Sequence, residues 1–127
     1  MQNNQPRLNR GKIHHSFGFA LSGIAHAFRD NRNIRVHTII AILVLLASFL
    51  LGLTKFEKII IFLIITLVIA SEMINTAIEE MTDLITNEHR QEAKAAKDVA
   101  AGMVLVTAIA AIIVGVLIFA PYIIELL

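Results

Sequence analysis

The sequence predicts an all-α membrane protein with three transmembrane helices and an amphipathic surface helix before them. Hydrophobic residues make up 57% of the 127 residues and charged residues 17%, whereas a typical soluble domain has about 45–50% and about 25%. A soluble domain of this size buries too little surface to hide so many aliphatic side chains. The mean hydropathy of +0.74 and three long apolar runs therefore indicate lipid surroundings.

Each apolar run is compared with the roughly 20 helical residues that cross a bilayer. The first run predicts a helix over about 33–53, and the third predicts one over about 96–124. The second reaches the required length only if its helix continues through Glu72, so we expect it over about 57–85. None of the runs alternates with the period of two that a membrane β-barrel requires.

The chain before the first span divides into a polar tail and an amphipathic helix. We expect residues 1–11 to be disordered and residues 12–127 to form a single membrane domain. The segment 13–29 is too short to span a membrane, and its basic ends suit a helix lying in the interface; a helix packed on other protein is the alternative. Its apolar residues recur at the spacing of one helix face, at Phe17, Ala20, Leu21, Ile24 and Phe28.

The basic residues predict the orientation in the membrane. Nine of the eleven Lys and Arg residues lie before the first span or between the second and third, and two lie in the opposite loop. Basic loops stay on the cytoplasmic side. We therefore expect a multi-pass protein of the cell membrane whose N-terminus and 84–98 loop are cytoplasmic.

Net charge and cysteine content exclude several classes of function. The formal net charge is +1, so no overall field favours nucleic acid as a partner. The chain has no cysteine, which rules out disulfides, thiolate metal sites and a cysteine nucleophile.

A row of acidic and amide side chains lies on the second apolar helix. Its members fall within about 80° of one helix face, at Glu72, Asn75, Glu79 and Asp83. A carboxylate inside a bilayer costs roughly 2.5–3.5 kcal/mol, so it normally has a partner or a function. Such oxygens bind hard cations such as Mg²⁺, and one carboxylate can act as a base. Hydrogen bonding between helices and an ion pathway are the other interpretations.

The third span contributes charges at its start and small residues further along. The ammonium groups of Lys94 and Lys97, next to Asp98, can hold phosphate. Ordinary anchoring at the positive side of the membrane explains Lys94 equally well and the Lys97-Asp98 pair less well. Thr107, Ala111 and Gly115 form a small-residue face that allows close helix packing. Because three helices of this size cannot enclose a reaction, we expect several copies to associate.

The acidic row is part of a longer motif. It reads Glu72-Met-Ile-Asn75-Thr-Ala-Ile-Glu79 and is followed by Ala96-Lys97-Asp98 and Ala100-Ala101-Gly102. The motif resembles the signature of the prokaryotic diacylglycerol kinase family of small membrane kinases, E-x-x-N-[ST]-A-I-E-x-x-x-D, and the similarity covers roughly residues 12–120. The segment Arg32-Asn33-Ile34-Arg35-Val36-His37 is similar to the undecaprenol kinase branch of Gram-positive bacteria.

The resemblance implies a role for each matching residue. Glu72 would be the general base that takes the proton from the lipid hydroxyl, and Glu79 would bind the Mg²⁺ that bridges the ATP phosphates. Glu72 and Ala101 would contact the lipid. Family members are homotrimers with composite sites between subunits. The residues implied at the nucleotide are Asn75, Lys97, Asp98, Lys12, Glu88, His89 and Arg90.

Two positions depart from the family pattern. The family usually has Glu, a second metal carboxylate, where this chain has Asn31. An amide is a poorer magnesium ligand, so either metal binding is weaker or the neighbouring Asp30 contributes. The segment Asn87-Glu88-His89-Arg90 matches the family only loosely, with the histidine one place early, so the adenine contacts stay open.

The sequence thus predicts an ATP-dependent lipid kinase that phosphorylates the hydroxyl of undecaprenol, with Mg²⁺ as cofactor. Diacylglycerol is the alternative acceptor. Glu72 lies roughly 10 Å deeper along the helix than Glu79, which suits a reaction between a lipid alcohol and a water-soluble nucleotide. A non-enzymatic ion-conducting or structural membrane bundle is the alternative of another class, and it predicts no ATP consumption.

Overall fold

The computed structural model describes the backbone of residues 10–85 and 90–127, and within those ranges the side chains from His15 onward. These residues form four α-helices and no strand. Three of the helices are long and apolar enough to cross a membrane, so the prediction of an all-α membrane protein with three spans after an N-terminal helix is confirmed. The helices are α1 (Arg10–Asp30), α2 (Arg32–Leu50), α3 (Lys55–Ile85) and α4 (Gln91–Glu125).

All four helices begin earlier than predicted, α2 and α3 by only one or two residues and α1 and α4 by more. α1 begins at Arg10, so the last residues of the predicted tail 1–11 are helical, and the rest of that tail lies outside the described residues. α4 begins at Gln91 rather than near 96, because Gln, Glu, Ala and Lys are strong helix formers that add nothing to an apolar run. Hydropathy marks where a helix enters lipid, whereas helix propensity extends it beyond that point.

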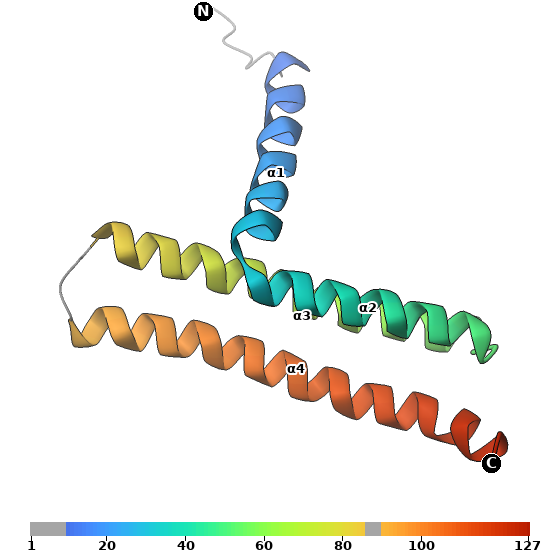
Figure 1. Cartoon of the computed structure of the whole chain (residues 1–127). Coiled ribbons are helices and arrows are strands. Elements are labelled where there is room, and N and C mark those ends of the chain that lie inside the picture. Colours follow the sequence, from blue (N-terminus) through green and yellow to red (C-terminus); the bar gives the residue numbers. More distant parts are fainter. Residues whose placement is uncertain (1–9, 86–89) are drawn as a thin grey trace, which may run out of the picture.

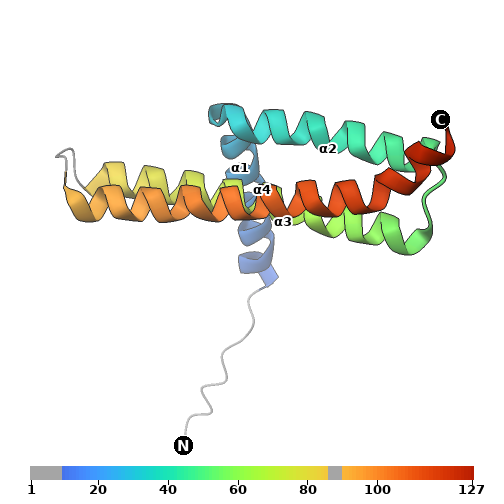
Figure 2. The same cartoon turned by 90° about the horizontal axis from the view of Figure 1, so that it is seen from below.

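The three long helices run alongside one another, and α1 crosses them at a steep angle (Figure 1). α3 packs most extensively on α4 and less on α2. In the second view, α2 covers only one half of the α3–α4 hairpin, and the other half extends beyond the α1–α2 junction (Figure 2). We call this extending part, residues 76–85 and 91–100, the polar end of the hairpin.

Most of the apolar surface of the three spans faces outward. The buried share of the most apolar window is 17% in α2, 33% in α3 and 6% in α4. α1 also exposes apolar side chains, among them Phe17 and Phe19 at 68% and 74%. Apolar surface of this extent requires lipid or further copies of the chain to cover it.

The turn between α2 and α3 depends on Gly52. The Leu53 N–H donates to the Ser48 carbonyl at 3.1 Å and the Gly52 N–H donates to the Phe49 carbonyl at 3.2 Å, which is the Schellman arrangement at a helix end. Gly52 has a φ of +68°, a left-handed conformation that glycine adopts without strain. α2 therefore ends earlier than the predicted bound of 53.

A capping interaction joins this corner to the far end of α4. The Thr54 backbone N–H and hydroxyl donate to Glu57 Oε2 at 2.8 and 2.6 Å. The Tyr122 hydroxyl donates to the same oxygen at 2.7 Å. The start of α3 is thus capped, and the last turns of α4 are held against it.

We predict opposite effects of the same substitution at two glycines. Gly52→Ala should lower the free energy of unfolding by about 1 kcal/mol, because alanine is strained at positive φ. Gly102→Ala, inside α4 where an added Cβ meets no atom within 4 Å, should raise it by about 0.4–1 kcal/mol. Unfolding in detergent micelles, followed by circular dichroism, measures both. An unchanged or more stable Gly52→Ala protein would contradict the role of the turn.

Candidate functional site

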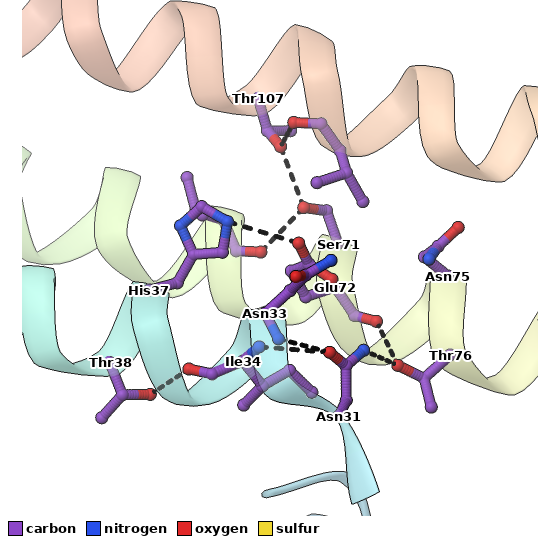
Figure 3. Close-up of polar contacts among 12 residues, drawn as sticks. Asn31, Asn33, Ile34, His37, Thr38, Ser71, Glu72, Asn75, Thr76 and Thr107 are labelled. Carbon is purple, nitrogen blue, oxygen red and sulfur yellow. Dashed lines mark hydrogen bonds and ion pairs between the residues drawn. The ribbon is translucent and has the colours of Figure 1, made fainter.

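Buried polar side chains gather where α2, α3 and α4 meet (Figure 3). Six polar side chains of the described residues are buried, and all except Ser48 lie in this region. Because burying polar groups in an apolar bundle is costly, this concentration marks the candidate site. The five that lie here are Ser71, Glu72, Asn75 and Thr76 of α3 and Thr107 of α4.

Glu72 is the most unusual of these groups. Its side chain is only 2% exposed, and its Oε1 lies 3.3 Å from Nε2 of His37 on α2. Its other oxygen, Oε2, is buried and has no hydrogen-bond partner among the described residues. Buried carboxylate oxygens are normally paired, so an oxygen that is both buried and without a partner makes Glu72 a candidate functional residue.

His37 is a functional candidate that the sequence analysis missed. The sequence alone shows five scattered histidines, and none of them stands at a helical spacing from Glu72. The signal that could have found His37 is its depth, since it lies one turn inside the first span, near the end that adjoins the charged part of the second. Only the packing of α2 on α3 brings the two side chains together (Figure 3).

The remaining residues of the acidic row lead from the buried site to the surface. Asn75 is 6% exposed, and its Nδ2 donates to Glu79 Oε1 at 3.1 Å. The Asn75 amide oxygen is buried without a partner among the described residues. Glu79 is exposed. The row therefore runs along α3 from a buried carboxylate, past an amide, to an exposed carboxylate that the amide contacts.

Charged side chains connect α3 and α4 in the polar end of the hairpin. Lys97 Nζ donates to Asp83 Oδ1 at 2.5 Å, and Lys94 Nζ lies 3.8 Å from Asp98 Oδ2 within α4. Lysine has three donors, so the contact with Asp83 leaves Lys97 with donors for a further anion. Ala101 follows one turn later on α4 and is exposed.

Asn31 has a structural role at the α1–α2 corner. Its Oδ1 accepts hydrogen bonds from the backbone N–H groups of Asn33 at 2.7 Å and Ile34 at 3.4 Å, so it caps the N-terminus of α2. Its Nδ2 donates to Thr76 Oγ1 at 2.5 Å. The oxygen that would bind a metal is thus used by the helix end.

Asp30, the carboxylate suggested as a substitute for position 31, also has a partner. His26 Nδ1 lies 2.9 Å from Asp30 Oδ2, and His26 Nε2 lies 2.9 Å from Glu80 Oε1. The imidazole therefore links α1 to the face of α3 that does not carry the acidic row. Glu80 lies on a different face of α3 from the acidic row, and its partner is His26.

The other residues implied by the resemblance are placed only in part. The side chain of Lys12, together with Glu88 and His89, lies outside the described residues, and Arg90 stands at the N-cap of α4. The part of the chain that the structure describes contains no group of three or more His, Asp or Glu side chains able to hold a metal. Mg²⁺ commonly uses one or two carboxylates together with substrate phosphates and water, so Glu79 is compatible with such a site.

These features define an integral membrane protein with a buried, half-paired carboxylate between apolar spans and a charged hairpin end. Residues 18–119 match the family described as prokaryotic diacylglycerol kinase, and the chain belongs to this family. The predicted family, fold and enzyme class are therefore confirmed: the chain is a membrane lipid kinase, which transfers phosphate from ATP to a lipid.

The similar proteins are named either undecaprenol kinase or diacylglycerol kinase. The undecaprenol kinase of Bacillus subtilis is 43% identical over 121 residues, which cover 95% of this chain and 98% of that protein. A diacylglycerol kinase of Synechocystis is 41% identical over 88% of this chain and 65% of its own length. One from Haemophilus influenzae is 33% identical over 77% of this chain and 80% of its own length.

The structure makes a prediction about position 31. Asn31→Ala should lower the free energy of unfolding by about 1 kcal/mol because α2 loses its N-cap. Asn31→Asp should retain most of the stability, since a carboxylate caps equally well. Thermal unfolding in detergent compares the two variants with the wild-type protein. Equal stability of Asn31→Ala and wild type would contradict the capping role.

Proposed function

We propose that this lipid kinase phosphorylates undecaprenol, with Glu72 as the general base and Mg²⁺ as the cofactor. The observation that carries the proposal is the buried Glu72 carboxylate, with Oε1 held by His37 and Oε2 unpartnered. The similarity to the Bacillus subtilis undecaprenol kinase over nearly the whole of both chains supports the acceptor. Diacylglycerol, the acceptor named in the other relatives, is the alternative.

The first step is positioning of the acceptor. The lipid hydroxyl donates a hydrogen bond to Glu72 Oε2, the oxygen without a protein partner. Glu72 takes the hydroxyl proton as the alcohol oxygen attacks the γ-phosphorus of ATP. The bond between that phosphorus and the oxygen bridging it to the β-phosphate breaks, and ADP leaves. A positioned base of this kind contributes roughly 10²–10⁴-fold to a rate.

His37 is the positioning residue for Glu72. By holding Oε1 at 3.3 Å, the imidazole fixes the carboxylate rotamer so that Oε2 faces the acceptor. It also stabilises the negative charge that a buried carboxylate carries at a site with little water. Orientation of this kind matters because small misplacements of a reacting group lower rates steeply.

The nucleotide is proposed to lie against the polar end of the hairpin. Glu79 would hold Mg²⁺ together with the ATP phosphates, and the ion would neutralise charge during phosphoryl transfer. Lys97, whose contact with Asp83 uses one donor, would hold a phosphate with the others. Asp98, one residue further along α4, would contact the same nucleotide. Asn75, which donates to Glu79, would orient that carboxylate at the nucleotide.

Orientation and assembly belong to the same proposal. The distribution of basic residues supports a cytoplasmic N-terminus and polar end, where ATP is available. The steep angle of α1 to the spans (Figure 1) suits a helix in the plane of the membrane. The exposed apolar faces support association into the homotrimer that the family resemblance implies, and light scattering in detergent measures the number of copies.

The central prediction concerns the carboxylate itself. Glu72→Gln should reduce transfer of labelled γ-phosphate from Mg·ATP to undecaprenol by at least about 100-fold, while membrane insertion and particle size are unchanged. Glu80→Gln, the matched control on another face of α3, should retain activity. Turnover close to wild type in Glu72→Gln would refute the base, and faster transfer to diacylglycerol by the wild-type protein would refute the acceptor.

A second prediction separates positioning from general stability. His37→Leu should lower kcat about 10- to 100-fold, because the close polar contact with the Glu72 carboxylate is lost, with the KM for ATP within about twofold of wild type. His37→Gln keeps an N–H donor at similar reach and should recover most of kcat. An unchanged kcat in His37→Leu, or no rescue by glutamine in a normally assembled protein, would contradict this role.

A further inference from the structure

Two hydrogen bonds in sequence lead from the α1–α2 corner to the backbone of the proposed base (Figure 3). Asn31 Nδ2 donates to Thr76 Oγ1 at 2.5 Å, and the Thr76 hydroxyl donates to the Glu72 backbone carbonyl at 2.9 Å. A hydroxyl has one proton to donate and lone pairs that accept, so Thr76 makes both bonds at once. Its exposed fraction is only 9%, so little water competes with either bond.

The corner from which these bonds start is fixed in place. Asn31 alone lies between α1 and α2, and its backbone N–H donates to the Ala27 carbonyl at 3.0 Å. Carbonyls in the last turn of a helix lack partners within that helix. Arg35 Nη1 of α2 donates to two such carbonyls of α1, those of Phe28 at 3.3 Å and Arg29 at 2.5 Å. Asn31 is therefore a firm support, since both helices that meet there are tied to each other.

A bond from a threonine hydroxyl to the carbonyl four residues earlier acts within one helix. Bonds of this kind join Thr38, Thr66 and Thr82 to Ile34, Phe62 and Ile78. At Thr76 the hydroxyl also accepts from Asn31. The bond from Thr76 to Glu72 therefore connects α3 with the α1–α2 corner, which gives it a reach beyond its own helix.

Glu72 is thereby held at two points from the side of α2. His37 contacts its carboxylate at 3.3 Å, and Asn31, the N-cap of α2, holds its backbone carbonyl through Thr76. Small misplacements of a reacting group lower rates steeply, and a side chain moves with the backbone that carries it. We propose, resting on the function proposed above, that Thr76 is a positioning residue for the Glu72 base, with Asn31 as its support.

This pair of bonds requires an amide at position 31. The Asn31 oxygen accepts from backbone N–H groups of α2 while its nitrogen donates to Thr76. A carboxylate has acceptors only, so an acid at position 31 would cap α2 but would draw the Thr76 proton away from the Glu72 carbonyl. The asparagine that departs from the family pattern thus supplies a contact that a carboxylate does not.

Substitutions at Thr76 test the proposal in the full-length protein in detergent. Thr76→Val keeps the shape of the side chain and removes the hydroxyl. It should lower kcat for transfer of labelled γ-phosphate to undecaprenol about 3- to 10-fold, the effect of one lost hydrogen bond. The KM values for ATP and undecaprenol should stay within about twofold of wild type. Thr76→Ser keeps the hydroxyl and should recover most of kcat.

Thr66→Val is the matched control, because it loses a hydroxyl bond of 2.8 Å within α3 at an exposed position. It should leave kcat unchanged. A wild-type kcat in Thr76→Val, an equal loss in Thr66→Val, or no recovery with serine in a normally assembled protein would overturn the proposal.

Asn31→Asp separates the two roles of position 31. The variant keeps the cap of α2 but has no N–H for Thr76. Its free energy of unfolding should stay close to wild type, while kcat falls by about the same 3- to 10-fold and the Mg²⁺ concentration for half-maximal activity is unchanged. A higher kcat or a lower Mg²⁺ requirement would mean that position 31 binds metal, and would overturn the proposal.

A double variant separates failure of this inference from failure of the base. Because Thr76 acts through Glu72, adding Thr76→Val to Glu72→Gln should not slow the residual transfer further. A further loss of about 3- to 10-fold would mean that Thr76 acts elsewhere, and would overturn the positioning role. If Glu72→Gln is inactive and Thr76→Val is fully active, only the positioning role fails. If Glu72→Gln keeps wild-type activity, the assignment of the base fails and the positioning role fails with it.

Discussion

The structure depends on how a carboxylate is kept inside an apolar helix bundle. Glu72 is almost completely buried, and its partner is an imidazole from another helix. Removing a charge from water without pairing it would cost far more than a single hydrogen bond returns. The contact between α2 and α3 is therefore more than packing, because it sets which oxygen of Glu72 is held and which one remains available.

Glu72 lies between an apolar part and a polar part of the α3–α4 hairpin. α3 and α4 are both longer than α2, so one half of the α3–α4 hairpin lies beside α2 and the other half extends past the α1–α2 junction (Figure 2). This extending half is the polar end, whose sequence includes Glu79, Asp83 and Lys97. Along the same face of α3, the buried apolar residues Ile61 and Val68 precede Glu72, and the rest of the acidic row follows it. In the proposed function, the lipid alcohol and the nucleotide approach Glu72 from these two directions.

The sequence predicted those features that depend on spacing along one helix. The three spans and the row from Glu72 to Glu79 follow from apolar length and helical period. The contact between His37 and Glu72 could not be predicted from spacing, because it arises from the packing of α2 on α3. The capping role of Asn31 also depends on a corner between helices, whereas the resemblance in the sequence implied a metal ligand at that position. Residues 88 and 89 lie outside the described part, so their nucleotide roles stay predictions.

The most direct test is a structure of the full-length protein in lipid nanodiscs, with undecaprenol, Mg²⁺ and a non-hydrolysable ATP analogue. The account predicts the prenol oxygen within about 2.5–3.0 Å of Glu72 Oε2, with His37 on the other oxygen of the carboxylate. A prenol hydroxyl bound away from Glu72, with both carboxylate oxygens paired to protein groups, would contradict it.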